Sequence, residues 1–280
     1  MHVMAVLFCC CLLSGDAPRA VDNQEWIQRD LAVARHIVSC LPPDGVPTSA
    51  WLAKLAPSRD ERFELGYGGR RHDLACYGGY TTTWITLVSF EDRIVSIDIK
   101  NPLEKDEVEP VGRVLTPVWS KYAQLSEGTL HYSYRDAVAL ADFRAAVSAA
   151  LGAPAKVAVS DAYAGAYALL TEPASKLVFG DICYYGGTKP EGRAATDSLV
   201  AGEQVALLRN VLRSMNPVAR VYAAAALLKL QANGTELVST DADVIEKIRT
   251  SKILLQACFG SLLHEQTAAV LLTNKDDKAK

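Results

Sequence analysis

The sequence predicts an α+β protein: a mixed first domain with antiparallel strands, followed by an α-helical subdomain. A run rich in Thr, Tyr, Trp, Ile and Val, which suit a pleated surface, precedes Glu91-Asp92, and the alternating run "RIVSIDIK" follows it; together they predict an antiparallel hairpin. A helical segment follows, with Asp136 in the position of its N-cap and Gly152 just past its end. Beyond Gly187 the apolar residues recur at helical spacing. Strands grouped before helices are typical of the α+β class.

The composition is that of a folded soluble protein of one or two domains. The chain has 280 residues, of which 50% are hydrophobic and 22% are charged. The formal net charge is −3, and no run of basic residues occurs along the chain. Since nucleic-acid-binding surfaces need concentrated positive charge, this composition argues against a nucleic-acid partner.

The first 20 residues are typical of a secretory signal peptide. An apolar run over residues 3–13 is followed by small residues, among them Ala17 and Ala20, as a cleavage site requires. The run is too short for a transmembrane segment, which takes ~20 apolar residues. No Lys or Arg precedes the run, however, and Pro18 would obstruct cleavage after Ala17. We expect a secreted or periplasmic protein; the alternative is a cytoplasmic protein whose first residues are a buried strand or follow a misassigned start.

Residues 21–155 are predicted to form the α+β domain, which begins with an amphipathic helix. Apolar residues recur at helical spacing over residues 23–39, and Pro42 ends the helix. The elements expected after it are a short helix over 49–55, strands over 72–90 and 92–100, a helix over 109–125 interrupted at Pro117, a strand over 129–136 and a helix over 137–151.

Residues 156–187 are an ambiguous connecting segment, and residues 188–274 are predicted to form the helical subdomain. In the connecting segment, "VSDAYAGAYALL" is alanine-rich, as a helix would be, but its glycine and tyrosines weaken that interpretation. "KLVFGDICYY" suits a strand or a buried helix. The helical subdomain should include a late helix with Ser239 or Thr240 as its N-cap. We expect a buried apolar end over residues 253–272 and a disordered tail over 275–280.

Two helices of this subdomain begin in the same way. "PEGRAATDSL" and "PVARVYAAAAL" each place an arginine three residues after a proline, and then alanines before a leucine. Residues 188–231 therefore resemble a HEAT-like repeat, a family of helical scaffolds that bind partners. The alternative is two ordinary helical hairpins. As the inner helix of such a repeat, the second segment would pack Ala223 and Ala226 against the preceding helix. Arg220 would bond carbonyls of the turn before it or an acidic neighbour, rather than a ligand.

The four cysteines beyond the signal peptide predict two disulfides. An even number of cysteines in an exported chain is typical of disulfide bonding, and four cysteines allow three pairings. We expect Cys40 to bond Cys76 and Cys183 to bond Cys258, because each pair lies within one predicted domain. In the cytosol the same residues would be buried thiols.

A repeated sequence contains two of these cysteines. "DLACYGG" at residues 73–79 returns as "DICYYGG" at residues 181–187. Glycine pairs allow backbone angles that other residues avoid, so both copies predict a turn after an apolar segment. We expect two strand-to-turn corners, each held by a disulfide and each carrying exposed tyrosines that form a binding rim. The tyrosines concerned are Tyr77, Tyr80, Tyr184 and Tyr185.

The common catalytic and cofactor motifs are missing from the sequence. His264-Glu265 lacks the second histidine of a metalloprotease motif, and no Cys-x-x-Cys pair or phosphate-binding loop occurs. We expect no cofactor and no metal. The remaining catalytic candidates are Cys76 and His72, which on one strand would lie ~13 Å apart, too far for a thiol and its base.

These observations favour an exported, non-catalytic binding module for a protein or a cell-envelope component. The alternative is an exported hydrolase with a dispersed active site that involves Cys76 and His72. The sequence does not indicate the oligomeric state.

Overall fold

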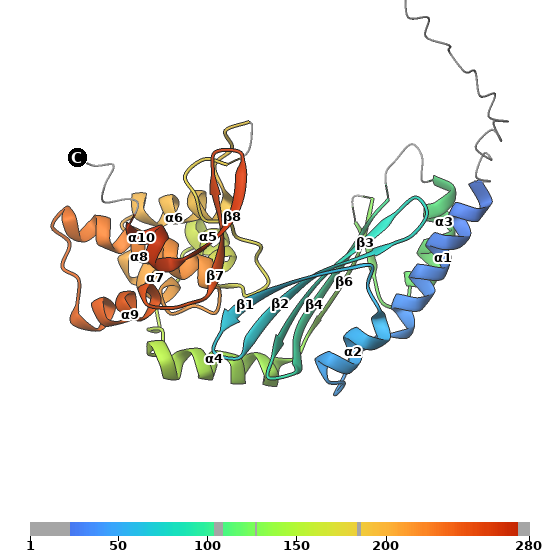
Figure 1. Cartoon of the computed structure of the whole chain (residues 1–280), viewed down its shortest axis with the longest axis horizontal. Helices are drawn as coiled ribbons and strands as arrows, with labels where there is room; N and C mark the ends of the chain where they lie inside the picture. Colours follow the sequence, from blue (N-terminus) through green and yellow to red (C-terminus); the bar gives the residue numbers. More distant parts are fainter. Residues whose placement is uncertain (1–22, 104–108, 127, 184–185, 274–280) are drawn as a thin grey trace, which may run out of the picture.

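The computed structural model describes residues 23–103, 109–126, 128–183 and 186–273, and its architecture is α+β as predicted (Figure 1). Six antiparallel strands form one sheet in the order β1-β2-β3-β4-β6-β5. The strands are β1 (Arg59–Gly66), β2 (Gly69–Tyr77), β3 (Thr82–Phe90), β4 (Arg93–Pro102), β5 (Gln124–Ser126) and β6 (Thr129–Arg135). The helices of this half are α1 (Asn23–Ser39), α2 (Thr48–Leu55), α3 (Glu109–Trp119) and α4 (Ala137–Leu151). The predicted signal peptide, residues 1–20, and the predicted tail, residues 275–280, lie outside the described residues.

The predicted hairpin consists of β3 and β4, with Glu91 and Asp92 as its turn. Both residues have positive φ, 47° and 64°, as the tight turn of an antiparallel hairpin requires. Strand β1 was not expected from the sequence, because charged residues dominate "RDERFELG". Charged side chains are usual on an edge strand such as β1, where they discourage pairing with other chains.

One face of the sheet, which we call the closed face, is packed against α1, α2 and α3. Apolar residues at alternate strand positions form a core with residues from all three helices. The core includes Ile37, Trp51, Leu55, Leu74, Ile85, Leu87, Ile97, Ile99, Leu115 and Trp119. The indole N–H of Trp51 donates to the carbonyl of Cys40 at 3.0 Å, which ties α2 to the end of α1. The closed face therefore holds the strands rigidly in place.

Helix α4 covers one end of the opposite face. Its N-cap is Asp136, whose carboxylate accepts from the backbone N–H groups of Val138 and Ala139, and Gly152 follows its end, both as predicted. Phe143 of α4 stacks on Phe90 of β3 with ring centroids 5.4 Å apart. This helix covers only the end of the sheet that carries the β3–β4 turn.

The second half of the chain is mainly helical. Its elements are α5 (Asp161–Thr171), α6 (Glu191–Ala201), α7 (Val205–Val211), α8 (Pro217–Ala232), α9 (Ser239–Arg249), β7 (Leu254–Phe259), β8 (Leu262–Thr267) and α10 (Ala268–Thr273). The sheet lies between this half and helices α1–α3 (Figure 1). Pro190 is the N-cap of α6 and Pro217 is the first residue of α8, as expected of proline at helix starts. The resemblance to a HEAT-like repeat stays a prediction.

Two expectations about this half were wrong or incomplete. The apolar end over 253–272 is not simply buried: it forms the β7–β8 hairpin and α10, and Leu262 and Leu263 on β8 are exposed. Gly260, at φ 65°, allows the turn that makes the hairpin possible. The segment "KLVFGDICYY" is neither strand nor helix over its described residues, and Phe179 makes a single bridge to Ala257 of β7.

The helical half and one end of the sheet share a core. Leu65, Val88 and Phe90 from the sheet belong to the same apolar cluster as the buried residues of α4, α6, α7 and α8. Ala223 of α8 is fully buried, as expected. Arg220, also buried, donates to the carbonyls of Ser214 (2.6 Å) and Met215 (2.9 Å) in the preceding turn and to Leu65 of β1 (3.2 Å).

Candidate binding face

The first copy of the repeated sequence closes a turn against helix α1. Asp30 of α1 is buried, and its carboxylate accepts from the backbone N–H groups of Gly79 (2.9 Å), Tyr80 (2.8 Å) and Thr81 (3.0 Å) and from the Thr81 hydroxyl (2.8 Å). A Cβ at Gly79 would collide with the carbonyl of Trp26, so only glycine lets the turn approach the helix this closely. The glycines of this copy are therefore explained by packing.

The same turn presents two of the predicted tyrosines. Tyr77 is 50% exposed and Tyr80 is 39% exposed. Tyr80 lies beside Trp26 of α1, with ring centroids 5.9 Å apart. Since Asp30 fixes the backbone between them, these aromatic side chains stand on a rigid support.

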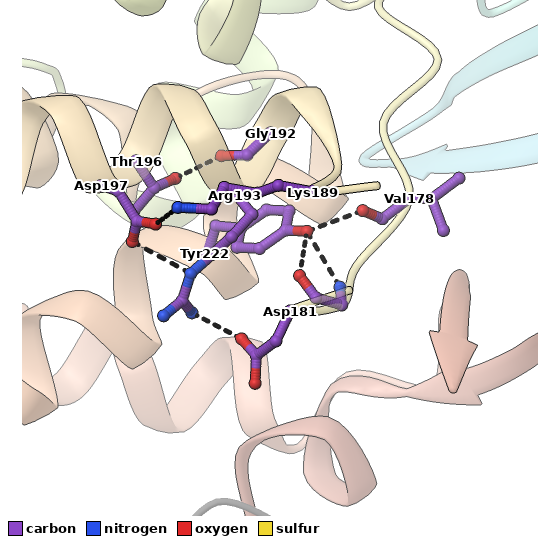
Figure 2. Close-up of polar contacts among 9 residues, drawn as sticks. Val178, Asp181, Lys189, Gly192, Arg193, Thr196, Asp197 and Tyr222 are labelled. Atoms are coloured by element: carbon purple, nitrogen blue, oxygen red, sulfur yellow. Dashed lines mark hydrogen bonds and ion pairs between the residues drawn. The ribbon is translucent and has the colours of Figure 1, made fainter. Parts of the chain in front are cut away.

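The second copy is built differently (Figure 2). The hydroxyl of Tyr222, from α8, accepts from the N–H of Gly180 at 2.9 Å and lies 2.8 Å from the carbonyl of Val178. Arg193 of α6 bonds Asp181 at 2.9 Å and Asp197 at 3.0 Å. Burial raises the pKa of Tyr222, which keeps its phenol neutral. The described residues of this copy, 181–183 and 186–187, contain no helix or strand, whereas the first copy ends strand β2, so the two copies are not one repeated structure.

Tyr184 and Tyr185 of the second copy lie outside the described residues. The cysteine before them, Cys183, forms the predicted disulfide with Cys258 of β7, with Cα atoms 5.6 Å apart. The predicted Cys40–Cys76 bond is not formed in this structure, where both residues are buried free thiols in the closed-face core. Only the second corner is therefore held by a disulfide.

The structure does not bring Cys76 and His72 together as a nucleophile and its base. Both lie on β2, where Cys76 pairs with Thr83 and His72 with Leu87. The His72 imidazole is buried and bonds Asp60 of β1 through Nδ1 at 3.0 Å. Burial raises the pKa of Cys76 to about 11, so this thiol is protonated at neutral pH. The geometry gives no support to catalysis by this pair.

One exposed surface of the sheet is the part that neither α1–α3 nor α4 covers. Strand register places Ala75, Trp84, Lys100 and His131 in one row across β2, β3, β4 and β6. In the next row, Thr86 pairs with Asp98. We call this surface the open face and define it by Tyr77, Trp84, Thr86, Asp98, Lys100 and His131.

Trp84 lies at the centre of the open face and is 43% exposed. Tyr77 lies diagonally across from it, because Ala75 pairs with Trp84 and Tyr77 with Thr82. Large aromatic side chains usually bury most of their surface in a monomer, so two exposed ones on neighbouring strands favour contact with a partner. The aromatic pair is the strongest sign that this face binds something.

The segment that follows α5 borders the open face on the side of the helical half. Glu172 bonds Arg135 of β6 at 2.7 Å, and the Ser175 carbonyl accepts from Arg71 of β2 at 2.9 Å. Lys176 pairs with Asp73 at 3.3 Å. Beyond this border, the side chains of Trp84 and Lys100 are exposed to solvent.

The charged groups of the open face are paired with one another. Asp98 bonds His131 Nε2 at 2.7 Å and lies 3.8 Å from Lys100 Nζ. On β1, Arg59 pairs with Glu61, and the hydrogen bond that Arg59 donates to the Glu61 carboxylate is the main cause that raises the pKa of Arg59. The face therefore offers donors and acceptors with little excess of either charge.

Sequence reasoning missed Trp84, Asp98, Lys100 and His131 as residues of the candidate site. A signal was present on β3, where Thr82, Trp84 and Thr86 alternate with buried Ile85 and Leu87. The alternation places Trp84 on the face opposite Ile85 and Leu87, but only the strand register places Lys100 and His131 beside it.

Two further observations concern the described part of the chain. Within it, no helix is long and apolar enough to cross a membrane, and no group of three His, Cys, Asp or Glu residues is placed to hold a metal ion. Comparisons of the chain with family models, with curated proteins and with solved structures found no match, so the interpretation of the open face depends on its own residues.

Proposed function

We propose that the protein is an exported, non-catalytic binding module, and that its open face binds a protein or a cell-envelope component. The observation that carries the proposal is Trp84, an aromatic side chain that is 43% exposed at the centre of a sheet face. Contacts of Trp and Tyr are enriched at binding surfaces, because their rings bury large areas with little loss of side-chain freedom.

The construction of the sheet supports this use of the face. The opposite side of the same strands is packed against α1, α2 and α3, and the Asp30 contacts fix the turn beside Tyr77. A surface held rigid before binding loses less conformational entropy when the ligand arrives. The open face is therefore preorganised for a partner.

Export is supported by the sequence of residues 1–20 and by the Cys183–Cys258 disulfide. Disulfides persist in secreted and periplasmic proteins and are rare in reducing compartments. Sequencing the N-terminus of the mature chain tests this part of the proposal. A mature chain that begins at Met1 would favour the cytoplasmic alternative.

Binding is tested by cosedimentation of the purified protein with cell envelopes of its source. We expect the wild-type protein to sediment with the envelopes and Trp84→Ala to remain in solution. Val138→Ala is the matched control, because Val138 is an apolar residue on α4 that is 64% exposed and lies away from the open face. Equal sedimentation of wild type and Trp84→Ala would contradict the proposal.

A further inference from the structure

The chemistry of the open face identifies a class of ligand. A pyranose ring has an apolar C–H face and hydroxyls around its edge, so it stacks on an aromatic ring and exchanges hydrogen bonds with groups beside that ring. Trp84 provides the ring. Asp98 provides acceptors in the neighbouring row, and Lys100 and His131 provide donors along the row of Trp84. Donors and acceptors thus lie beside one exposed aromatic side chain.

The pairing of charges favours a neutral ligand. Asp98 is bonded to His131, Asp73 to Lys176 and Arg59 to Glu61, so these groups already balance one another. An anionic polymer would require a surplus of basic residues on the face, and the whole chain has a net charge of −3. A cationic partner would need an excess of carboxylates, which the same pairs do not leave.

The row that contains Trp84 runs across the strands. Neighbouring strands are ~4.8 Å apart, so the positions of Ala75, Trp84, Lys100 and His131 follow one another at that spacing. A β-1,4-linked glycan is an extended ribbon that advances by about one strand spacing per sugar. Successive sugars of such a chain would therefore meet successive strands.

We propose that the open face binds a neutral β-1,4-linked glycan that lies across the strands, with Trp84 as its stacking platform. This inference rests on the proposed binding function and narrows it to the glycan part of a cell envelope. Asp98 accepts hydrogen bonds from sugar hydroxyls, and Lys100 and His131 donate to them. Tyr77 lies diagonally from Trp84 and extends the aromatic surface toward the β2–β3 turn.

The experiment measures binding of cellohexaose and chitohexaose by calorimetry and by tryptophan fluorescence. We expect at least one of these β-1,4 hexasaccharides to bind the wild-type protein, and Trp84→Ala to bind it about tenfold more weakly because one stacking contact is lost. Trp84→Phe retains an aromatic ring and should bind at least as well as Trp84→Ala; Val138→Ala should match the wild type. Maltohexaose has the same number of sugars in a curved α-1,4 chain and should bind at least tenfold more weakly.

Three results would overturn the glycan inference. These are no binding of either β-1,4 hexasaccharide, equal binding by Trp84→Ala, and equal binding of maltohexaose. Since Trp84 is partly exposed, circular dichroism of each variant should match that of the wild type, which excludes unfolding as the cause of lost binding.

Treated envelopes separate failure of this inference from failure of the proposed function. One portion is digested with protease, and another is treated with anhydrous acid that cleaves glycosidic bonds and leaves peptide bonds. Trp84-dependent sedimentation that survives protease and is lost after acid supports a glycan. Sedimentation that is lost after protease and survives acid identifies a protein partner and overturns the glycan inference alone. No Trp84-dependent sedimentation with untreated envelopes contradicts the proposed function itself.

Discussion

Replacing Arg220 by methionine tests how strongly the helical half is bound to the sheet. Arg220 is 3% exposed, and it donates to the carbonyls of Ser214, Met215 and Leu65. Its guanidinium also lies over the ring of Tyr67, 5.0 Å from the centroid. Burial lowers the pKa of Arg220 to about 10, which shows the cost of holding this cation away from water. Methionine has a similar length and none of the donors.

The loss of unfolding free energy expected for Arg220→Met results from two opposing effects. Three buried carbonyls lose their donor, and each orphaned group costs roughly 1–3 kcal/mol. Removing the cation recovers part of its desolvation penalty, so the net loss of unfolding free energy is about 3 kcal/mol. For a chain of this size, such a loss lowers the melting temperature by roughly 6–12 °C.

Urea denaturation followed by circular dichroism and by tryptophan fluorescence measures the change. Arg220→Lys is the control: it keeps the charge and loses the forked geometry, so its loss should fall between those of the wild type and Arg220→Met. A loss below about 1 kcal/mol for Arg220→Met would show that water or other donors reach the three carbonyls, and that the contact with Leu65 does not hold the two halves together.

Three further predictions concern packing, the disulfide and pH. Ala223→Leu should cost about 1–3 kcal/mol of unfolding free energy, because it overpacks a fully buried site, whereas Ala232→Leu at the exposed end of the same helix should be nearly neutral. Equal denaturation midpoints for the two variants would contradict this prediction. Peptide mapping without reduction should find Cys183 bonded to Cys258. Replacing both cysteines by serine should lower the unfolding free energy by about 4 kcal/mol in the chain-entropy model, since the bond joins residues that are 75 positions apart. Burial raises the pKa of Asp60, but hydrogen bonds from His72 and Arg62 outweigh this and hold the pKa below its ordinary value. The contribution of Asp60 to stability is thus present above pH ~4 and lost as the pH falls through the folded-state pKa of Asp60. Asp60→Asn should therefore reduce the loss of stability in acid, as measured by denaturation between about pH 6 and pH 3.

Local signals in the sequence were sufficient for the elements that begin and end with distinctive residues. The β3–β4 hairpin follows from its alternating strands and its acidic turn, and α4 from Asp136 and Gly152. Helix α8 follows from Pro217. In each case the stabilising contact lies within a few residues of the signal, so no knowledge of the fold is needed.

Features that depend on distant residues could not be predicted in this way. The N–H groups of the β2–β3 turn bond Asp30, about 50 positions earlier in the chain. Strand β1 is polar and becomes a strand only because β2 offers it a partner. The row of Trp84, Lys100 and His131 exists only in the paired sheet, so composition and periodicity cannot reveal it.

The disulfide also changes the outcome of a break in the backbone. Cys183 and Cys258 enclose α6, α7, α8 and α9 in one covalent ring. A single protease cut at any exposed loop inside that ring, such as the one around Gly234, leaves both fragments joined by the sulfur bridge. A nicked molecule therefore keeps all its parts until a reductant opens the bridge.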